Sequence, residues 1–305
     1  MKKIKLLAIY AVFSAGLIAG CSAMYDKFVE EAFKIQPNYS SKYNPVAPIE
    51  KTYAQKGKFA VMSEVFSSNH DKFQTFKVWY PSDMATTNTR YPVIVSANGT
   101  GFPYQKYEPV LARLASWGFV VIANDDPDSW SGLSSSLSLN KLIALNTEKN
   151  SLFYGKLNTQ NAGIVGHSQG GVAVINTITK QANATNYKAA VALSPTNLEL
   201  AKGLKWAYDP TLVKTPIMLL SGEGGGDDWV VKGEQLAQIY QLINSEKVMA
   251  RRKQTGHGET LYASDGYVTA WFMWKLQNDN RAAQVFTGAK AEILHNPLYT
   301  NVKIR

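Results

Sequence analysis

Short apolar runs alternate with segments of helical periodicity from residue 58 to residue 277, and this alternation limits the possible folds more than any other feature of the sequence. Several of the runs are almost continuously apolar, as strands buried on both faces are. The predicted strands are 58–67, 73–81, 91–99, 118–125, 162–168, 188–195, 215–223 and 247–256. The helical segments between and after them are 107–117, 170–181, 233–243 and 266–277.

Strands that alternate with helices predict an α/β fold, in which a mostly parallel central sheet has helices on both faces. The composition does not change after residue 50, so we expect a single domain over 51–305. The stretch 131–146 suffices for one crossover helix and leaves no room for a large lid. In open α/β sheets the functional site lies beyond the carboxyl ends of the strands. The loops of interest follow residues 97, 125, 167, 194, 222 and 256.

The sequence Gly166-His167-Ser168-Gln169-Gly170 stands between a predicted strand and a predicted helix. A G-x-S-x-G spacing is weak by itself, but this context is that of a nucleophile elbow, where a strained turn exposes a serine. The glycines are needed because a Cβ there would clash with the strand and the helix. We therefore predict that Ser168 is a nucleophile. The alternative is a glycine-rich turn with an unreactive serine.

A serine hydroxyl needs a base to take its proton. Of the four histidines, His257 follows a predicted strand, stands between two glycines and comes after the serine in the chain. We predict that His257 is the base. His167 lies inside the elbow and is expected to pack or hydrogen-bond locally.

The acid that orients the histidine should leave the loop after the strand 215–223. The stretch 222–231 offers three carboxylates, and its three consecutive glycines allow the loop to bend towards the histidine. We predict Asp228, with Asp227 as the alternative and Glu223 as a minor candidate. The tetrahedral oxyanion would be bound by the backbone N–H of Gln169, at a helix N-terminus, and by that of Thr100. The loop around Thr100 could also be a plain glycine turn.

The N-terminus combines Lys2, Lys3 and Lys5 with an apolar run over 6–19 that is too short to favour a transmembrane helix. It ends in Leu17-Ile18-Ala19-Gly20-Cys21, which resembles a bacterial lipobox, and Cys21 is the single cysteine of the chain. We expect a signal peptide over 1–20, a lipidated Cys21 and a tether over 21–50 that is partly helical near 24–35. Ser22 favours the outer membrane of the bacterial envelope.

The formal net charge of +9 is scattered, and its densest cluster, Arg251-Arg252-Lys253, falls inside a predicted strand. Nucleic-acid binding would require a basic stripe or a known motif, and the sequence has neither. It also lacks a phosphate-binding loop and a metal-ligand motif, so we expect no cofactor and no metal.

These motifs together resemble the α/β-hydrolases, and more narrowly the bacterial group of cutinases, polyester hydrolases and platelet-activating-factor acetylhydrolase-like esterases. The resemblance is carried by PVIVSANGTG, LARLASWGFVVIANDD, AGIVGHSQGG, KAAVALSP, PIMLLSGE with DDWVV, and GHGE. It spans 58–287 and implies the roles given above for Ser168, His257, Asp228, Thr100 and Gln169. The polyesterases of this group usually have an aromatic residue where Thr100 stands, a methionine where Gln169 stands and a tryptophan after the strand 188–195.

The expected function is therefore that of a serine carboxylic-ester hydrolase that acts through an acyl-enzyme on small-molecule or polymeric esters. An amidase or an acyltransferase would use the same three residues. A surface-binding lipoprotein that keeps the fold without catalysis is the alternative from another functional class.

Overall fold

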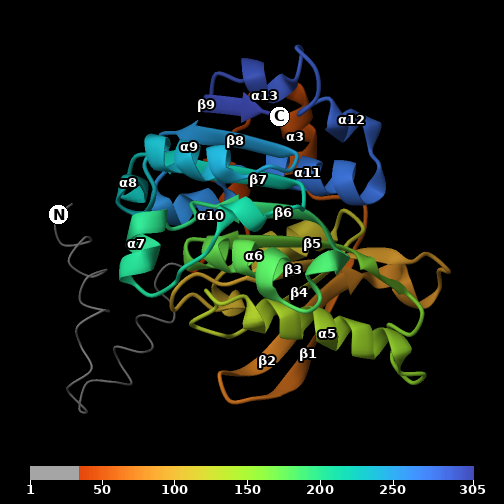
Figure 1. The fold of residues 1–305 in the computed structure, drawn as a ribbon. Helices are drawn as coiled ribbons and strands as arrows, with labels where there is room; N and C mark the ends of the chain where they lie inside the picture. The colour runs from red at the N-terminus through yellow and green to blue at the C-terminus, as the bar shows by residue number, and fades with distance from the viewer. Residues whose placement is uncertain (1–33) are drawn as a thin grey trace. The chain divides into compact units, whose positions relative to one another are not determined.

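The computed structural model describes residues 34–305, and their contacts group Ile35–Arg305 into one compact unit. The described residues form a nine-stranded sheet in the order β1-β2-β4-β3-β5-β6-β7-β8-β9 (Figure 1). Neighbours from β4 to β8 are parallel, whereas β1, β2 and β9 pair antiparallel. The strands are β1 Val61–His70, β2 Phe73–Pro81, β3 Tyr91–Ala97, β4 Val120–Asn124, β5 Leu157–His167, β6 Tyr187–Leu193, β7 Ile217–Glu223, β8 Lys247–Lys253 and β9 Tyr299–Ile304. The predicted α/β fold with a mostly parallel sheet is confirmed.

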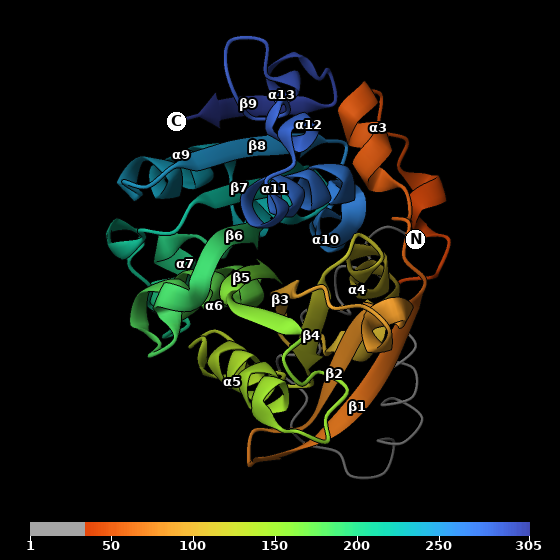
Figure 2. The same ribbon diagram turned by 90° about the vertical axis from the view of Figure 1, so that its right-hand side faces the viewer.

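Helices cover both faces of this sheet (Figure 2). Side chains of α5, α6 and α9 pack on one face, and those of α4, α10 and α11 pack on the other. The longer helices are α4 Glu108–Ala115, α5 Leu133–Thr147, α6 Gln169–Lys180, α9 Gly233–Leu242 and α11 Asp265–Gln277. The shorter ones are α3 Pro48–Ala54, α7 Leu198–Gly203, α8 Asp227–Val230, α10 Thr260–Ala263, α12 Asn280–Ala283 and α13 Glu292–His295. As expected, the stretch after β4 forms a single crossover helix, α5.

The apolar runs are explained by the two cores that the sheet separates. Alternate side chains of a strand point to opposite faces. In β3, Val93 and Val95 join the core beneath α5 and α6, whereas Ile94 joins the core beneath α4 and α11. Every residue of β3 is buried, which explains why the strand is apolar along most of its length.

The N-terminal segment, defined here as residues 35–54, is part of the folded unit. Ile35, Tyr39 and Tyr53 are buried in the core that includes α11, and α3 packs against α11. Glu50 is 1% exposed and accepts hydrogen bonds from Arg252 at 3.1 Å and from the Tyr299 hydroxyl at 2.6 Å. The predicted tether over 21–50 is therefore too long at its C-terminal end, because residues 35–50 belong to the folded unit, held by burial and by an ion pair.

The predicted signal peptide, Cys21 and nearly all of the helix expected near 24–35 lie outside the described residues. Within residues 34–305, no helix is both long enough and apolar enough to span a bilayer.

Candidate active site

Ser168 occupies a strained turn between β5 and α6. Its φ is 61° and its ψ is −119°, a conformation that few residues with a side chain adopt. A Cβ at Gly166 would lie 2.2 Å from the Gly170 carbonyl oxygen, and one at Gly170 would lie 2.3 Å from that of Ala97. The glycines on either side are thus required by close backbone approach, as the elbow interpretation anticipates.

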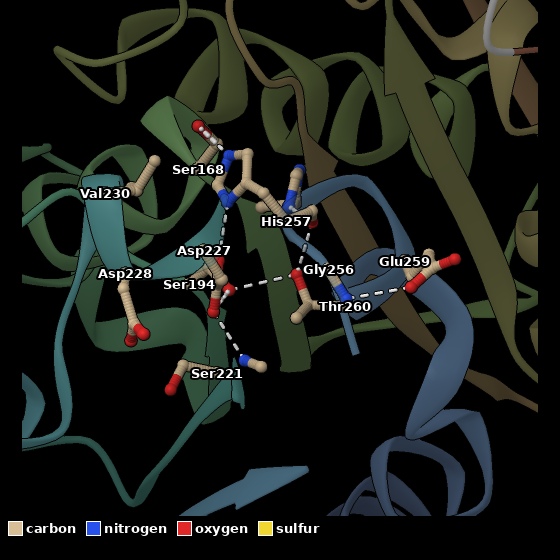
Figure 3. Close-up of polar contacts among 12 residues, drawn as sticks. Ser168, Ser194, Ser221, Asp227, Asp228, Val230, Gly256, His257, Glu259 and Thr260 are labelled. Atoms are coloured by element: carbon tan, nitrogen blue, oxygen red, sulfur yellow. Dashed lines mark hydrogen bonds and ion pairs between the residues drawn. The ribbon is translucent and has the colours of Figure 1, made fainter. Parts of the chain in front are cut away.

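His257 lies between Ser168 and a buried carboxylate (Figure 3). Its Nε2 is 2.9 Å from the Ser168 hydroxyl oxygen, and its Nδ1 is 2.6 Å from Oδ1 of Asp227. The imidazole is a quarter exposed, whereas Asp227 is fully buried. The loops after β5, β7 and β8 therefore bring a hydroxyl, an imidazole and a carboxylate into one chain of hydrogen bonds.

The carboxylate beside the histidine is Asp227, so the prediction of Asp228 is corrected. Asp228 Oδ1 instead accepts a hydrogen bond from Arg251 at 2.5 Å, and its side chain is 52% exposed. The two residues begin the short helix α8, where successive side chains point about 100° apart, so only one can face the histidine. Glu223 ends β7 and is exposed.

The second oxygen of Asp227 has its own donors. Oδ2 accepts from the Gly222 N–H at 2.5 Å and from the Ser194 hydroxyl at 3.0 Å. The Ser194 hydroxyl oxygen is in turn 2.9 Å from that of Thr260, which lies 2.7 Å from the His257 carbonyl oxygen. Sequence reasoning missed Ser194 and Thr260. Ser194 begins the loop after β6, which the predicted order of strands had placed among the loops of interest. Its neighbours in the sequence do not distinguish it from any serine in a turn.

His167 contacts His257 through a hydrogen bond and through its ring. Its Nε2 is 2.7 Å from the His257 carbonyl oxygen, and the two ring centroids are 4.5 Å apart. Burial, and then the neighbouring His257, hold the pKa of His167 well below its ordinary value. A neutral His167 must carry its proton on Nε2, because a carbonyl oxygen can only accept.

The two predicted oxyanion donors lie in the loops after β3 and β5. Gly101 N–H donates to the Pro127 carbonyl and Phe102 N–H to the Gly99 carbonyl, whereas neither Thr100 N–H nor Gln169 N–H has an acceptor among residues 34–305. The Gln169 side chain is buried: its Oε1 accepts from the Ser129 N–H at 2.8 Å, and its Nε2 donates to Asp128 at 3.0 Å. Among the described residues, no cluster of three His, Cys, Asp or Glu side chains could hold a metal ion.

No curated protein matches the chain. A family model described as PET hydrolase-like matches residues 37–298, which include the whole sheet up to β8 and all the residues of the candidate site. The match also begins inside the N-terminal segment, in agreement with its place in the folded unit. By this match and by its fold, the chain belongs to the PET hydrolase-like family of α/β-hydrolases.

Proposed function

We propose that the protein hydrolyses carboxylic esters through a covalent intermediate on Ser168. The observation that carries the proposal is the unbroken series of contacts from the Ser168 hydroxyl through His257 to Asp227. A buried carboxylate fixes the tautomer of an imidazole and stabilises the positive charge that the imidazole gains when it takes the serine proton. Family membership supports ester hydrolysis as the reaction.

In the proposed reaction, His257 Nε2 removes the proton of Ser168 as Oγ attacks the ester carbonyl carbon. The negative charge on the carbonyl oxygen is stabilised by the N–H groups of Thr100 and Gln169, which are free to donate, and Gln169 stands at the N-terminus of α6. His257 then protonates the departing alcohol. In the second half, His257 activates water, which releases the acid and restores Ser168.

The surroundings of the site favour flexible aliphatic esters over flat aromatic ones. Gln169 and Thr196 are buried, and the Gln169 side chain is bound to Asp128 and Ser129. They stand where polyesterases usually place apolar side chains that bind flat groups. Trp229, two residues after Asp227, is 70% exposed. It is a large apolar side chain near Asp227 that could contact an apolar part of an ester.

The direct test is the Ser168→Ala variant assayed on para-nitrophenyl acetate, butyrate and octanoate and on PET film. We expect kcat to fall by about 10⁶-fold, the loss typical of a removed nucleophile. A fluorophosphonate should label Ser168 of the natural protein, as peptide mass spectrometry would show. Ester turnover that survives in Ser168→Ala, or a folded natural protein that is neither labelled nor active, would contradict the proposal. Turnover of amides would change the proposed function to that of an amidase. Transfer of the acyl group to added alcohols would change it to that of an acyltransferase.

We further propose that Cys21 carries a lipid that holds the protein at the outer membrane. The support is the match of 17–21 to a lipobox and the position of the single cysteine. At least one further membrane signal or acyl chain is needed for stable anchoring, and a lipoprotein cysteine carries several chains. The full chain expressed in a Gram-negative host should enter the detergent phase on phase partitioning, and Cys21→Ser should enter the aqueous phase. Equal partitioning of the two would refute the anchor.

A further inference from the structure

Two hydroxyl groups next to the site have no role in the reaction described above. Ser194 directly follows β6, and Thr260 is the first residue of α10. Both are buried, at 0% and 4% exposure. They lie between Asp227 and the backbone of His257, so that acid and base are joined both through their side chains and through this second route (Figure 3).

The number of hydroxyl protons limits which group donates in each hydrogen bond of this second route. Its three contacts, Asp227 to Ser194, Ser194 to Thr260 and Thr260 to His257, share two hydroxyl protons. A carboxylate and a carbonyl can only accept hydrogen bonds. If Ser194 donated to Thr260, it would turn a lone pair towards a buried carboxylate oxygen 3.0 Å away, which is unfavourable. Ser194 therefore donates to Asp227.

The proton of Thr260 has two possible acceptors. It can go to the His257 carbonyl, or to Ser194, in which case both hydroxyls point along one chain towards the carboxylate. The second arrangement does not leave the carbonyl unpaired, because His167 Nε2 also reaches it at 2.7 Å. Hydrogen bonds in such a chain polarise and strengthen one another. In this second arrangement Thr260 acts on Asp227 through Ser194.

The backbone of Ser194 is a second, independent observation. Its φ is 43°, in the left-handed region that favours glycine. A strained residue persists only where its surroundings compensate, and such residues gather at functional sites. A glycine would remove the strain at this position but could not supply the hydroxyl.

We propose that Ser194 and Thr260 are positioning residues, which form a hydroxyl chain that holds Asp227 in the orientation His257 requires. This inference rests on the proposed function, since it assigns how the acid of that site is held. Gly222 N–H and Ser194 together fix Oδ2, which leaves Oδ1 directed at the imidazole. Loss of the chain should therefore weaken orientation of the base rather than binding of the ester.

The test compares Ser194→Ala, Ser194→Gly, Thr260→Val and the double variant Ser194→Ala/Thr260→Val. We expect kcat to fall about 10- to 100-fold in both Ser194 variants, with KM nearly unchanged, because a hydrogen bond to a charged group is lost. Thr260→Val should lose about 3- to 10-fold, and Thr260→Ser should restore the loss. If the two hydroxyls act as one chain, the double variant should be no slower than Ser194→Ala alone.

Two further readouts separate positioning from mere stability. Ser194→Gly should melt no lower than Ser194→Ala, since it relieves the positive φ, and yet remain slow. The far-downfield proton resonance of the hydrogen bond between His257 and Asp227 should move in Ser194→Ala. Ser135→Ala is the matched control, because Ser135 is equally buried but its hydroxyl has no partner among the described residues.

Three results would overturn the hydroxyl chain. The variants could keep kcat within twofold, or they could lose activity only in proportion to the fall in melting temperature. The effects of the two substitutions could also add in the double variant. The resonance is measured on the free protein and does not require turnover. A resonance that moves as expected in a protein that hydrolyses no ester would reject the proposed function and leave the positioning role standing. A resonance that does not move in an active esterase would reject the positioning role and leave the proposed function standing.

Discussion

Asp227 and Asp228 are neighbours in the chain but have opposite surroundings. Asp227 is fully buried and accepts from His257, Gly222 and Ser194. Asp228 is half exposed and pairs with Arg251. A buried carboxylate with three donors is held in one position as an acceptor, whereas a half-exposed carboxylate with one cationic partner is held less firmly. At the scale of single residues, burial and donor count distinguish the two.

This contrast gives a paired prediction. Asp227→Asn should lower kcat on a para-nitrophenyl ester by about 10⁴-fold, because an amide permits the wrong tautomer of His257. Asp228→Asn preserves shape and removes only the charge of the exposed pair, so it should lower kcat less than about tenfold. Both variants should be compared at equal folded concentration, checked by circular dichroism. A larger loss in Asp228→Asn than in Asp227→Asn would return the acid role to Asp228.

At the scale of elements, the loop between β7 and α8 explains why the sequence could not choose between these aspartates. Gly224, Gly225 and Gly226 have φ values of 136°, 55° and 95°, all in the region open mainly to glycine. A Cβ at Gly225 would lie 2.7 Å from the Cα of Gly256, so the acid loop and the base loop are in backbone contact. Three glycines predict that the loop bends, but the direction of the bend depends on this tertiary contact.

The parallel strands could be predicted because burial on both faces produces a continuous apolar run in the sequence of the strand itself. β3 and β7 lie inside the predicted runs 91–99 and 215–223, since a strand buried on both faces is usually apolar along most of its length. β9 and α3 were not predicted. The burial pattern of β9 contains one buried residue, Tyr299, and α3 begins with a proline in a stretch that has the composition of a tether. Their stability comes from distant partners rather than from their own patterns.

At the scale of the whole molecule, the N-terminal segment and the C-terminal third are held together by buried charges. Arg252 pairs with Glu50, 202 positions earlier in the chain, and Arg113 Nε contacts Asp265 at 3.0 Å. Tyr39 donates its hydroxyl to the same carboxylate of Asp265. Arg252, in the cluster Arg251-Arg252-Lys253, thus has a structural role, which local charge density could not indicate.

These pairs predict how the chain tolerates shortening. Chains that begin at residue 22 and at residue 35 both keep the N-terminal segment and serve as references. A chain that begins at residue 51 removes Glu50 and leaves the buried guanidinium of Arg252 without its carboxylate. Breaking a buried pair costs about 3 to 5 kcal/mol, so this chain should be strongly destabilised or insoluble. Urea unfolding followed by tryptophan fluorescence would measure the difference, and equal midpoints for all three chains would contradict it.

The same pairing sets an order of events during synthesis. A nascent chain that has reached residue 240 already has Ser168 and Asp227, but it lacks His257, and Glu50 has not met its partners at positions 252, 296 and 299. Contacts between such distant positions form slowly, because closing a long loop costs entropy before the contact contributes. The molecule therefore cannot assemble its site piece by piece as it emerges from the ribosome. The site is therefore completed late, at the stage when β9 meets α3.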